Sequence, residues 1–414
     1  MRSLRSPAYL KRWSERFALY STPAESGKAD IIFHAVSVGE VHAAVPLINR
    51  LLDNNPELSV LVTTSTPTGS ARVMSMLKGK VAHVYLPYDL PGAIQRFLNT
   101  FNPGLLVIME TELWPNLIHG CSKRGVRLLL ANARLSEKSL HNYQRIKHLA
   151  STMLGQLDSV TAQSSRDSER LQLLGLAEEK IVVAGSVKFD MEINSAQVAQ
   201  ALTDKISLLE RPVLIAASTR VLDGEMEESK VLQAFSLLLG KHPDLLLILV
   251  PRHPERFDGV LELAIRQGFR CARRSREGLA DASHQILLGD SMGEMQYYFS
   301  LADIAFVGGS LVATGCQNII EPAALGLPII TGPSLFNFQA VSEELLQAGG
   351  MVSVVNAQEL AEVVDGLLAD EEKRAALAKA ALAVVEKNQG ASDRNLNEIS
   401  ELLLLLALRK AASH

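Results

Sequence analysis

The stretch His34-Ala35-Val36-Ser37-Val38-Gly39-Glu40 follows an apolar run at residues 31–33 and precedes residues 41–52, whose apolar positions recur at helical spacing. This order predicts a buried strand, a loop of small residues and a helix. In an open parallel sheet, such a loop lies at the carboxyl end of its strand, where ligands bind. Gly39 would let the backbone or a ligand approach closely.

Glu40 is expected in the first turn of the predicted helix, where the helix dipole favours an ionised carboxylate. An ionised carboxylate at the edge of a cleft is suited to act as a general base. The alternative is that Glu40 only caps the helix. The local sequence leaves both interpretations open.

The chain has 414 residues, too many for one ordinary core, so two domains are expected. Its 47% of hydrophobic and 21% of charged residues are typical of a soluble globular protein. The net charge of −4 argues against nucleic-acid binding, because no overall positive field would attract phosphates. The three cysteines are far apart and no metal-binding motif is present, so we expect a reducing compartment and no metal.

The first twenty residues are basic and carry interleaved aromatic side chains. Their cations, which stand against the single acid Glu15, are Arg2, Arg5, Lys11, Arg12 and Arg16. The chain has no apolar run of about 18 residues, so no membrane-spanning helix is expected. A basic segment that contains Trp13 and Phe17 can lie on an anionic membrane surface. The alternative is a terminal helix that packs its aromatic side chains on the domain.

Strand-like and helix-like segments alternate along both halves of the chain, which predicts two doubly wound α/β domains with right-handed crossovers. In the first half, strands are expected at residues 31–33, 60–64, 82–86, 104–109, 127–131, 159–162 and 180–184. In the second half, they are expected at residues 212–217, 245–250, 270–272, 285–288, 304–307 and 328–331.

Domain boundaries follow from this alternation. The predicted parts are a basic membrane-proximal segment (1–20), a first α/β domain (21–190), a helical linker (191–211), a second α/β domain (212–385) and a C-terminal helix (386–414). Residues 402–406 form an apolar run that we expect to be buried. Two such domains joined by a linker would place a cleft between them.

The loops of the second domain resemble a site for an anion and a nucleotide. Pro251-Arg252-His253-Pro254 follows a strand, and Arg252 there can make a forked contact with phosphate. Residues 290–295 precede a helix, whose free N–H groups can bind phosphate. Small residues at 308–310 would let a flat ligand approach the backbone, and Glu321 can accept hydrogen bonds from ribose hydroxyls. Each signal is weak alone, but four at successive strand ends predict a nucleotide site.

Acidic residues follow the most apolar strand of the first domain. Glu110 and Glu112 flank Thr111 there, and two acids at that position are hard to explain by packing. Lys188 lies near the predicted linker and could reach the same cleft. An ordinary surface lysine is the alternative.

Together these stretches resemble the bacterial 3-deoxy-D-manno-oct-2-ulosonic acid (Kdo) transferases, which glycosylate the lipid A precursor. The resemblance extends from residue 7 to about residue 350. The most specific block is Met109-Glu110-Thr111-Glu112-Leu113-Trp114-Pro115-Asn116. The other stretches that carry the resemblance are residues 36–40, 85–91, 131–136, 185–190, 250–256 and 306–311.

The resemblance implies a GT-B fold, in which two Rossmann-like domains face a central cleft. The first would bind the acceptor, the second would bind CMP-Kdo, and the last helix would pack back on the first. It also implies an inverting, metal-independent and cofactor-independent transfer of Kdo to lipid IVA, at the cytoplasmic face of the bacterial inner membrane.

The resemblance further implies roles for individual residues. Glu40 would be the proton acceptor, and Glu110 and Lys188 would stabilise the transition state. The implied CMP contacts are Pro251, Arg252, Met292, Gly293, Glu294, Asn318, Ile319, Ile320 and Glu321.

The chain departs from the family pattern in the second domain. A family Ser-Thr-His-Glu-Gly-Glu segment reads Ser-Thr-Arg-Val-Leu-Asp-Gly-Glu at residues 218–225, with extra residues and with Arg220 in place of a histidine. A usual Gly-Gly-His-Asn reads Gly-Cys-Gln-Asn at residues 315–318, and residues 332–338 lack another histidine. The apolar N-terminal anchor of the family is absent from this sequence, so we expect either a preceding anchor segment or membrane contact through the protein surface.

Two other functions fit the same residues. One is a GT-B enzyme that uses a UDP-sugar and a lipid or peptidoglycan acceptor. The other is a non-enzymatic α/β protein that binds a sugar in its cleft. Two acids and a lysine near that cleft favour catalysis.

Overall fold

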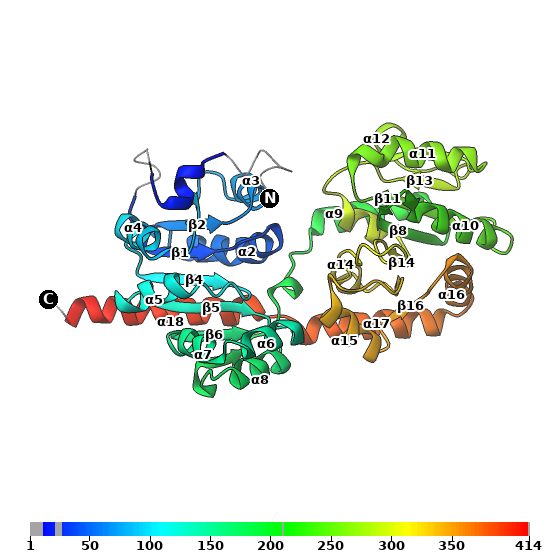
Figure 1. Ribbon diagram of the computed structural model, residues 1–414. Coiled ribbons are helices and arrows are strands. Elements are labelled where there is room, and N and C mark those ends of the chain that lie inside the picture. Colours follow the sequence, from blue (N-terminus) through cyan, green and yellow to red (C-terminus); the bar gives the residue numbers. More distant parts are fainter. Residues whose placement is uncertain (1–10, 21–26, 209–210, 413–414) are drawn as a thin grey trace. The chain divides into compact units, whose positions relative to one another are not determined.

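The chain forms two compact α/β units in a computed structural model that describes residues 11–20, 27–208 and 211–412. One unit comprises Met1–Asp190 and Gln389–His414, and the other comprises Met191–Asn388 (Figure 1). Each unit is built on a parallel sheet with helices on both faces, which is the GT-B class of architecture. No helix of the described residues is long and apolar enough to cross a membrane.

The first unit is built around seven parallel strands. In spatial order they are β3 (Ala82–Tyr85), β2 (Val60–Thr64), β1 (Ile31–His34), β4 (Leu105–Met109), β5 (Arg127–Ala133), β6 (Ser159–Ala162) and β7 (Ile181–Val183). Its helices are η2 (Trp13–Phe17), α2 (Val38–Asn54), α3 (Pro67–Met76), α4 (Pro91–Phe101), α5 (Pro115–Lys123), α6 (Glu137–Gln144), α7 (Lys147–Gly155), α8 (Ser165–Leu173), η4 (Glu178–Lys180), η5 (Val187–Phe189) and α18 (Ala391–Ala412).

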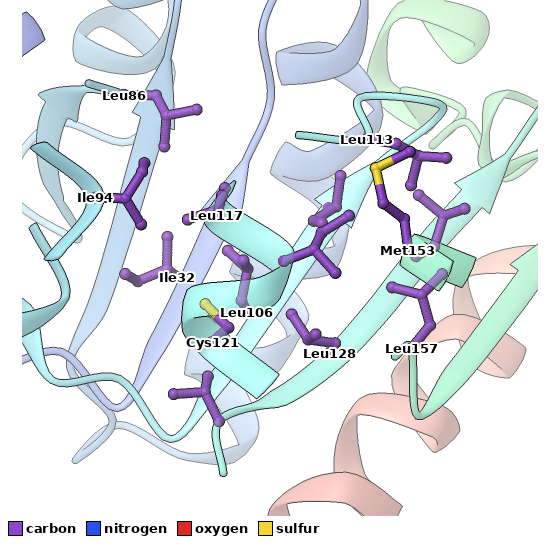
Figure 2. Close-up of a cluster of buried hydrophobic side chains, with 14 of the residues drawn as sticks. Ile32, Leu86, Ile94, Leu106, Leu113, Leu117, Cys121, Leu128, Met153 and Leu157 are labelled. Carbon is purple, nitrogen blue, oxygen red and sulfur yellow. The ribbon is translucent and has the colours of Figure 1, made fainter. Parts of the chain in front are cut away.

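The central strands of this sheet are apolar because both of their faces are covered. Side chains alternate along a strand, so Ile31 and Phe33 face α2, α3 and α18, while Ile32 faces the other layer. In that second layer, Leu117 and Cys121 of α5 lie over strand residues such as Leu106 (Figure 2). This two-sided burial fixes the carboxyl ends of β1 and β4, where the expected site residues follow.

The C-terminal helix α18, red in Figure 1, packs on the first sheet. The chain returns to this unit at Gln389. The expectation that residues 402–406 are all buried is wrong. Leu402 is 5% exposed, but Leu404 and Leu405 are 60% and 46% exposed, because a helix that lies on a sheet buries only one of its sides.

The described part of the basic N-terminal segment is attached to the first unit. Residues 1–10 lie outside the described residues. Glu15 and Arg16 of η2 are buried, and they bind the Tyr85 N–H and the Ser65 carbonyl, respectively. Trp13 of the same element is 54% exposed. This segment therefore does not pack all of its aromatic side chains on the domain.

The second unit repeats the architecture of the first. Its main sheet runs in the order β12 (Cys271–Arg273), β13 (Ile286–Leu288), β11 (Leu246–Pro251), β8 (Val213–Thr219), β14 (Ile304–Val307), β15 (Ile329–Thr331) and β16 (Met351–Ser353). Its helices are α9 (Ser195–Ser207), α10 (Glu227–Leu239), η6 (Pro254–Arg256), α11 (Phe257–Arg266), α12 (Arg274–Glu277), α13 (Met295–Leu301), α14 (Ile320–Ala324), α15 (Gln339–Gln347), α16 (Ala357–Ala369) and α17 (Glu371–Asn388).

Two features of the second unit differ from the expected elements. Helix α9, within the expected linker, belongs to the second unit, because it packs beside α13 and its Asp204 accepts a hydrogen bond from Tyr297 at 2.7 Å. The sequence patterns also did not predict β16 or a small hairpin of β9 (Val221–Leu222) and β10 (Glu225–Met226). That hairpin overlaps the 218–225 segment that departs from the family pattern.

Candidate active site

Glu40 lies in the first turn of α2, directly after the carboxyl end of β1. Its carboxylate accepts hydrogen bonds from the Val36 N–H at 2.7 Å and from the Ser37 hydroxyl at 2.8 Å. Ser37 is the N-cap residue, and its hydroxyl oxygen accepts from the Glu40 N–H at 3.5 Å. Glu40 therefore makes the contacts that are expected if it caps the helix. Each of its oxygens keeps a second lone pair for another donor.

The environment of Glu40 changes its acidity. The residue is 7% exposed, and burial raises its pKa to about 7. The hydrogen bonds from Ser37 and Val36 oppose this rise, while the charges of Glu110 and Glu112 add to it. A carboxyl group with a pKa near neutrality can accept a proton efficiently at physiological pH. Helix capping and general-base chemistry are thus compatible in this residue.

Glu110 and Lys188 lie together at the same edge of the first sheet. Glu110 follows β4 and has φ +58°, a left-handed conformation that is uncommon for a residue with a side chain. The Lys188 Nζ lies 3.9 Å from Glu110 Oε1, and both side chains are partly exposed. All three predicted catalytic residues belong to the first unit, and the charge of Glu110 raises the pKa of Glu40.

The loop that carries Lys188 is attached at both ends by residues to which the sequence analysis assigned no role. Asn132, buried at the end of β5, accepts a hydrogen bond from the Val187 N–H at 3.2 Å. Asp190 accepts from the N–H groups of Gly390 and Ser392 at the start of α18. Asp190 belongs to the 185–190 stretch that carries the resemblance, but its partners are about 200 residues away along the chain, so no sequence pattern indicated this contact.

In the second unit, several of the predicted donor-binding residues come together. Arg252 follows Pro251 at the end of β11, and its Nε donates to the Gln317 side-chain oxygen at 3.3 Å. The Asn318 amide donates to Glu321 at 3.5 Å. Burial raises the pKa of Glu321, while a hydrogen bond from Gln296 and the nearby charge of Arg252 oppose the rise. A guanidinium, two amides and a carboxylate thus form a polar cluster that can bind a phosphate and hydroxyl groups.

Ile319 and Ile320 occupy a different position from the one expected for ligand contacts. Both residues are at most 1% exposed, backbone and side chain together, so the structure leaves neither of them open to a ligand. At the start of α14, the Ile320 N–H donates a hydrogen bond to the Asn318 side-chain oxygen at 3.1 Å.

The Met292-Gly293-Glu294 loop is held by contacts within its own unit. Glu294 pairs with Arg274 at 3.1 Å and accepts from the Ser291 hydroxyl. Burial opposes the ionisation of Glu294, but these hydrogen bonds lower its pKa. The Gly293 carbonyl accepts from Gln197 of α9 at 2.8 Å, while Met292 is 66% exposed. The Glu294 carboxylate therefore fixes the loop, and the exposed backbone remains for a ligand.

Residues 308–310 do not offer an open surface to a flat ligand. A Cβ on Gly308 would lie 2.6 Å from the Thr219 Cα and 2.8 Å from a carboxylate oxygen of Glu227. Glu227 and Glu228 of α10 are both 0% exposed, and Glu228 pairs with Arg256 at 2.6 Å. These two acids were not predicted from the sequence. Helical spacing from Glu227 to Val231 and from Glu228 to Leu232 was the signal that could have placed them on the buried side.

Within the described residues, no group of three His, Cys, Asp or Glu side chains is arranged to hold a metal ion. Independence of metals and cofactors stays a prediction.

Solved structures share the two-unit architecture. UDP-GlcNAc 2-epimerase from Neisseria meningitidis aligns with a TM-score of 0.58, over 90% of this chain and 99% of that chain, at 14% identity. A glycosyltransferase from Rickettsia africae aligns with a TM-score of 0.56, over 92% of this chain and 99% of that chain, at 15% identity. At these identities the likeness concerns the fold alone.

Sequence comparisons are more specific. Residues 11–191 match the 3-deoxy-D-manno-octulosonic-acid transferase (kdotransferase) family, and residues 214–384 match glycosyl transferases group 1. The chain is 41% identical over 405 residues to the 3-deoxy-D-manno-octulosonic acid transferase of Haemophilus influenzae, which covers 97% of this chain and 93% of that protein. The Bordetella pertussis enzyme of the same name is 36% identical over 91% of this chain and 88% of its own length. The chain therefore belongs to the 3-deoxy-D-manno-octulosonic acid transferase family.

Proposed function

We propose that this protein transfers Kdo from CMP-Kdo to a glucosamine hydroxyl of lipid IVA, with inversion at the anomeric carbon and with Glu40 as the general base. The observation that carries the proposal is the Glu40 carboxylate, which is held by Val36 and Ser37 and has a pKa of about 7. Family membership supports Kdo as the transferred sugar.

In this reaction the acceptor oxygen forms a bond to the anomeric carbon of Kdo while the bond from that carbon to the CMP phosphate breaks. The bonding electrons leave with CMP, and the acceptor proton passes to Glu40. Phosphate is a good leaving group and needs no protonation, so the chemistry asks for one base and no matching acid. The base acts on the side opposite the leaving group, which accounts for inversion.

Glu110 and Lys188 are assigned to charge stabilisation. Loss of CMP gives the sugar oxocarbenium character, which a carboxylate such as Glu110 can stabilise. Lys188, 3.9 Å from Glu110, can balance that carboxylate or the negative charge of the departing phosphate. The left-handed backbone of Glu110 supports this assignment, since a strained conformation costs about 1–3 kcal/mol and persists where function selects it.

Donor binding is assigned to the second unit. Arg252 makes no ion pair with a carboxylate among the described residues, which leaves its charge for the donor phosphate. Glu321 and Asn318 offer an acceptor and an amide for the ribose hydroxyls, and the backbone of residues 292–294 completes the proposed contacts. No metal or cofactor is included in this proposal.

An aromatic patch on the first unit supports contact with the cytoplasmic face of the inner membrane. We define it as Trp13, Phe17, Leu19, Tyr88 and Leu90. The Phe17 ring lies 5.0 Å from the Trp13 ring and 5.4 Å from the Tyr88 ring, and the other two side chains are more than half exposed. Exposed Lys11 lies beside the patch in the sequence. Aromatic and cationic side chains together bind anionic lipid surfaces.

Mass spectrometry of lipid IVA incubated with CMP-Kdo and the protein tests the proposal. The expected result is a product heavier by one or more Kdo units, together with release of CMP. In parallel, CMP should raise the melting temperature and UDP should not. Stabilisation by UDP alone, without consumption of CMP-Kdo, would favour a transferase that uses a UDP-sugar. Sugar binding without turnover would favour a non-enzymatic binding protein.

A further inference from the structure

The loop after β14 forms a backbone anion site that is already filled by a side chain of the protein. Gly309 has φ +77°, and the N–H groups of three successive residues turn toward one point. The Glu227 carboxylate occupies that point and accepts from Gly309 at 2.6 Å, from Ser310 at 3.0 Å and from Leu311 at 2.8 Å. Successive N–H groups in such a turn make a concavity that binds anions, including phosphate.

The same carboxylate also holds the loop after β8. The Arg220 N–H donates to Glu227 at 3.0 Å, and the Glu227 N–H donates back to the Arg220 carbonyl at 3.0 Å. Glu227 therefore connects the ends of two strands that are neighbours in the sheet. Arg220 is the residue that stands where the family pattern has a histidine.

The loop after β14 is hydrogen-bonded to the polar cluster that contains Arg252 and Gln317. The Gly308 carbonyl accepts from the Gln317 N–H at 3.0 Å, and the Gln317 side chain in turn accepts from Arg252. The Lys230 Nζ, one turn along α10 from Glu227, donates to the Leu311 carbonyl at 3.0 Å. The positions of Gln317 and Arg252 thus depend on the loop that Glu227 fixes.

We propose that Glu227 is a positioning residue of the donor site, whose carboxylate fills the backbone anion site at residues 309–311 and holds the Arg220 and Gln317 loops in the geometry that CMP-Kdo requires. A consequence is that these N–H groups are not available to the donor phosphate, which must be bound by side chains such as Arg252. The inference rests on the proposed function only for the identity of the donor.

Removal of the Glu227 side chain tests the filled anion site directly. Glu227→Ala leaves a void lined by the N–H groups of residues 309–311, which formate can enter. We expect kcat/KM for CMP-Kdo to fall roughly 100-fold, the order of loss from a misplacement of about 1 Å. The KM for lipid IVA should stay unchanged. Tens of millimolar formate should restore much of the loss, whereas formamide, which is neutral and of similar size, should not.

Two further variants control the experiment. Glu225→Ala removes an exposed acid of the adjacent hairpin that pairs with Lys230 at 2.7 Å, and it should bind CMP like the unmodified protein. Glu227→Gln keeps the shape and loses the charge, so it should lose donor affinity without any response to formate. Donor kinetics within twofold of the unmodified protein for both Glu227 variants would overturn the positioning role.

A readout that does not need the donor separates this inference from the proposed function. Formate should raise the melting temperature of Glu227→Ala and leave that of the unmodified protein unchanged, because a ligand stabilises only the fold that binds it. If the unmodified protein fails to use CMP-Kdo while formate still stabilises the variant, the proposed donor is wrong and the filled anion site stands. If formate and formamide act alike on Glu227→Ala, the filled anion site is refuted.

Discussion

Replacing Ser37 with alanine should raise the pKa of Glu40 and shift the pH dependence of transfer. The Ser37 hydroxyl donates to Glu40 at 2.8 Å, and this bond stabilises the ionised carboxylate that acts as base. Without it, burial and the charges of Glu110 and Glu112 oppose ionisation with less compensation. The sign is therefore upward from a pKa of about 7.

The size of the shift follows from the strength of that hydrogen bond. A bond to a charged group contributes about 1.5–3 kcal/mol, and one pKa unit corresponds to about 1.4 kcal/mol, so the pKa should rise by roughly one to two units. At about pH 7.5 the ionised fraction of Glu40 would fall from roughly three quarters to a quarter or less, which lowers kcat/KM at least about threefold. The rate should recover at about pH 9.5, where the base is ionised again.

The assay is kcat/KM for CMP-Kdo from about pH 5.5 to 9.5, and the limb of the profile at low pH should move upward in Ser37→Ala. Loss of the helix cap is a separate effect that costs about 0.5–2 kcal/mol of stability. Asn356→Ala controls for it, because Asn356 caps α16 in the second unit and accepts from the Glu359 N–H at 2.9 Å. A uniform loss of rate at every pH, or a limb that does not move, would refute the reasoning about Glu40.

Glu112→Gln should move the same limb downward, because removal of a neighbouring negative charge favours ionisation of Glu40; a pH profile identical to that of the unmodified protein would contradict this coupling. Asp190→Asn should lower the melting temperature of the protein by several degrees in a calorimetric scan, because Gly390 and Ser392 lose a charged acceptor worth roughly 1–3 kcal/mol. Asp393 is an exposed partner of Arg50, so Asp393→Asn should change the melting temperature little. Trp13→Ser should weaken binding to vesicles that contain phosphatidylglycerol about tenfold without changing CMP binding, and equal vesicle binding in a flotation assay would exclude the aromatic patch as the contact.

Much of the architecture could be predicted from periodicity. Long apolar strands such as residues 105–109 are buried on both faces, and that environment leaves a strong local signal. Short edge elements such as β16 carry few residues and little pattern, so they were missed. The role of α9 depends on its packing against α13, which no local pattern of residues 195–207 reports.

Some residues of the site could be predicted from the sequence and others could not, because only some of them lie in short local motifs. Glu40, Glu110 and Lys188 follow strand ends in short motifs, and the structure brings them together in one unit. The raised pKa of Glu40 depends in part on the charges of Glu110 and Glu112 after β4, which the motif around Glu40 does not contain. Glu227 looks like its neighbour Glu225 in the sequence, yet one is fully buried and the other exposed, because only tertiary packing distinguishes them.

The most direct test of the account is transfer of Kdo by Glu40→Gln. The amide cannot accept the proton of the acceptor hydroxyl, so transfer from CMP-Kdo to lipid IVA should fall about 10²- to 10⁴-fold at every pH. Donor binding is assigned to the second unit, so calorimetry should give nearly the same CMP affinity as in the unmodified protein. Retention of more than about one tenth of the activity, with CMP binding intact, would contradict the assignment of Glu40 as the base.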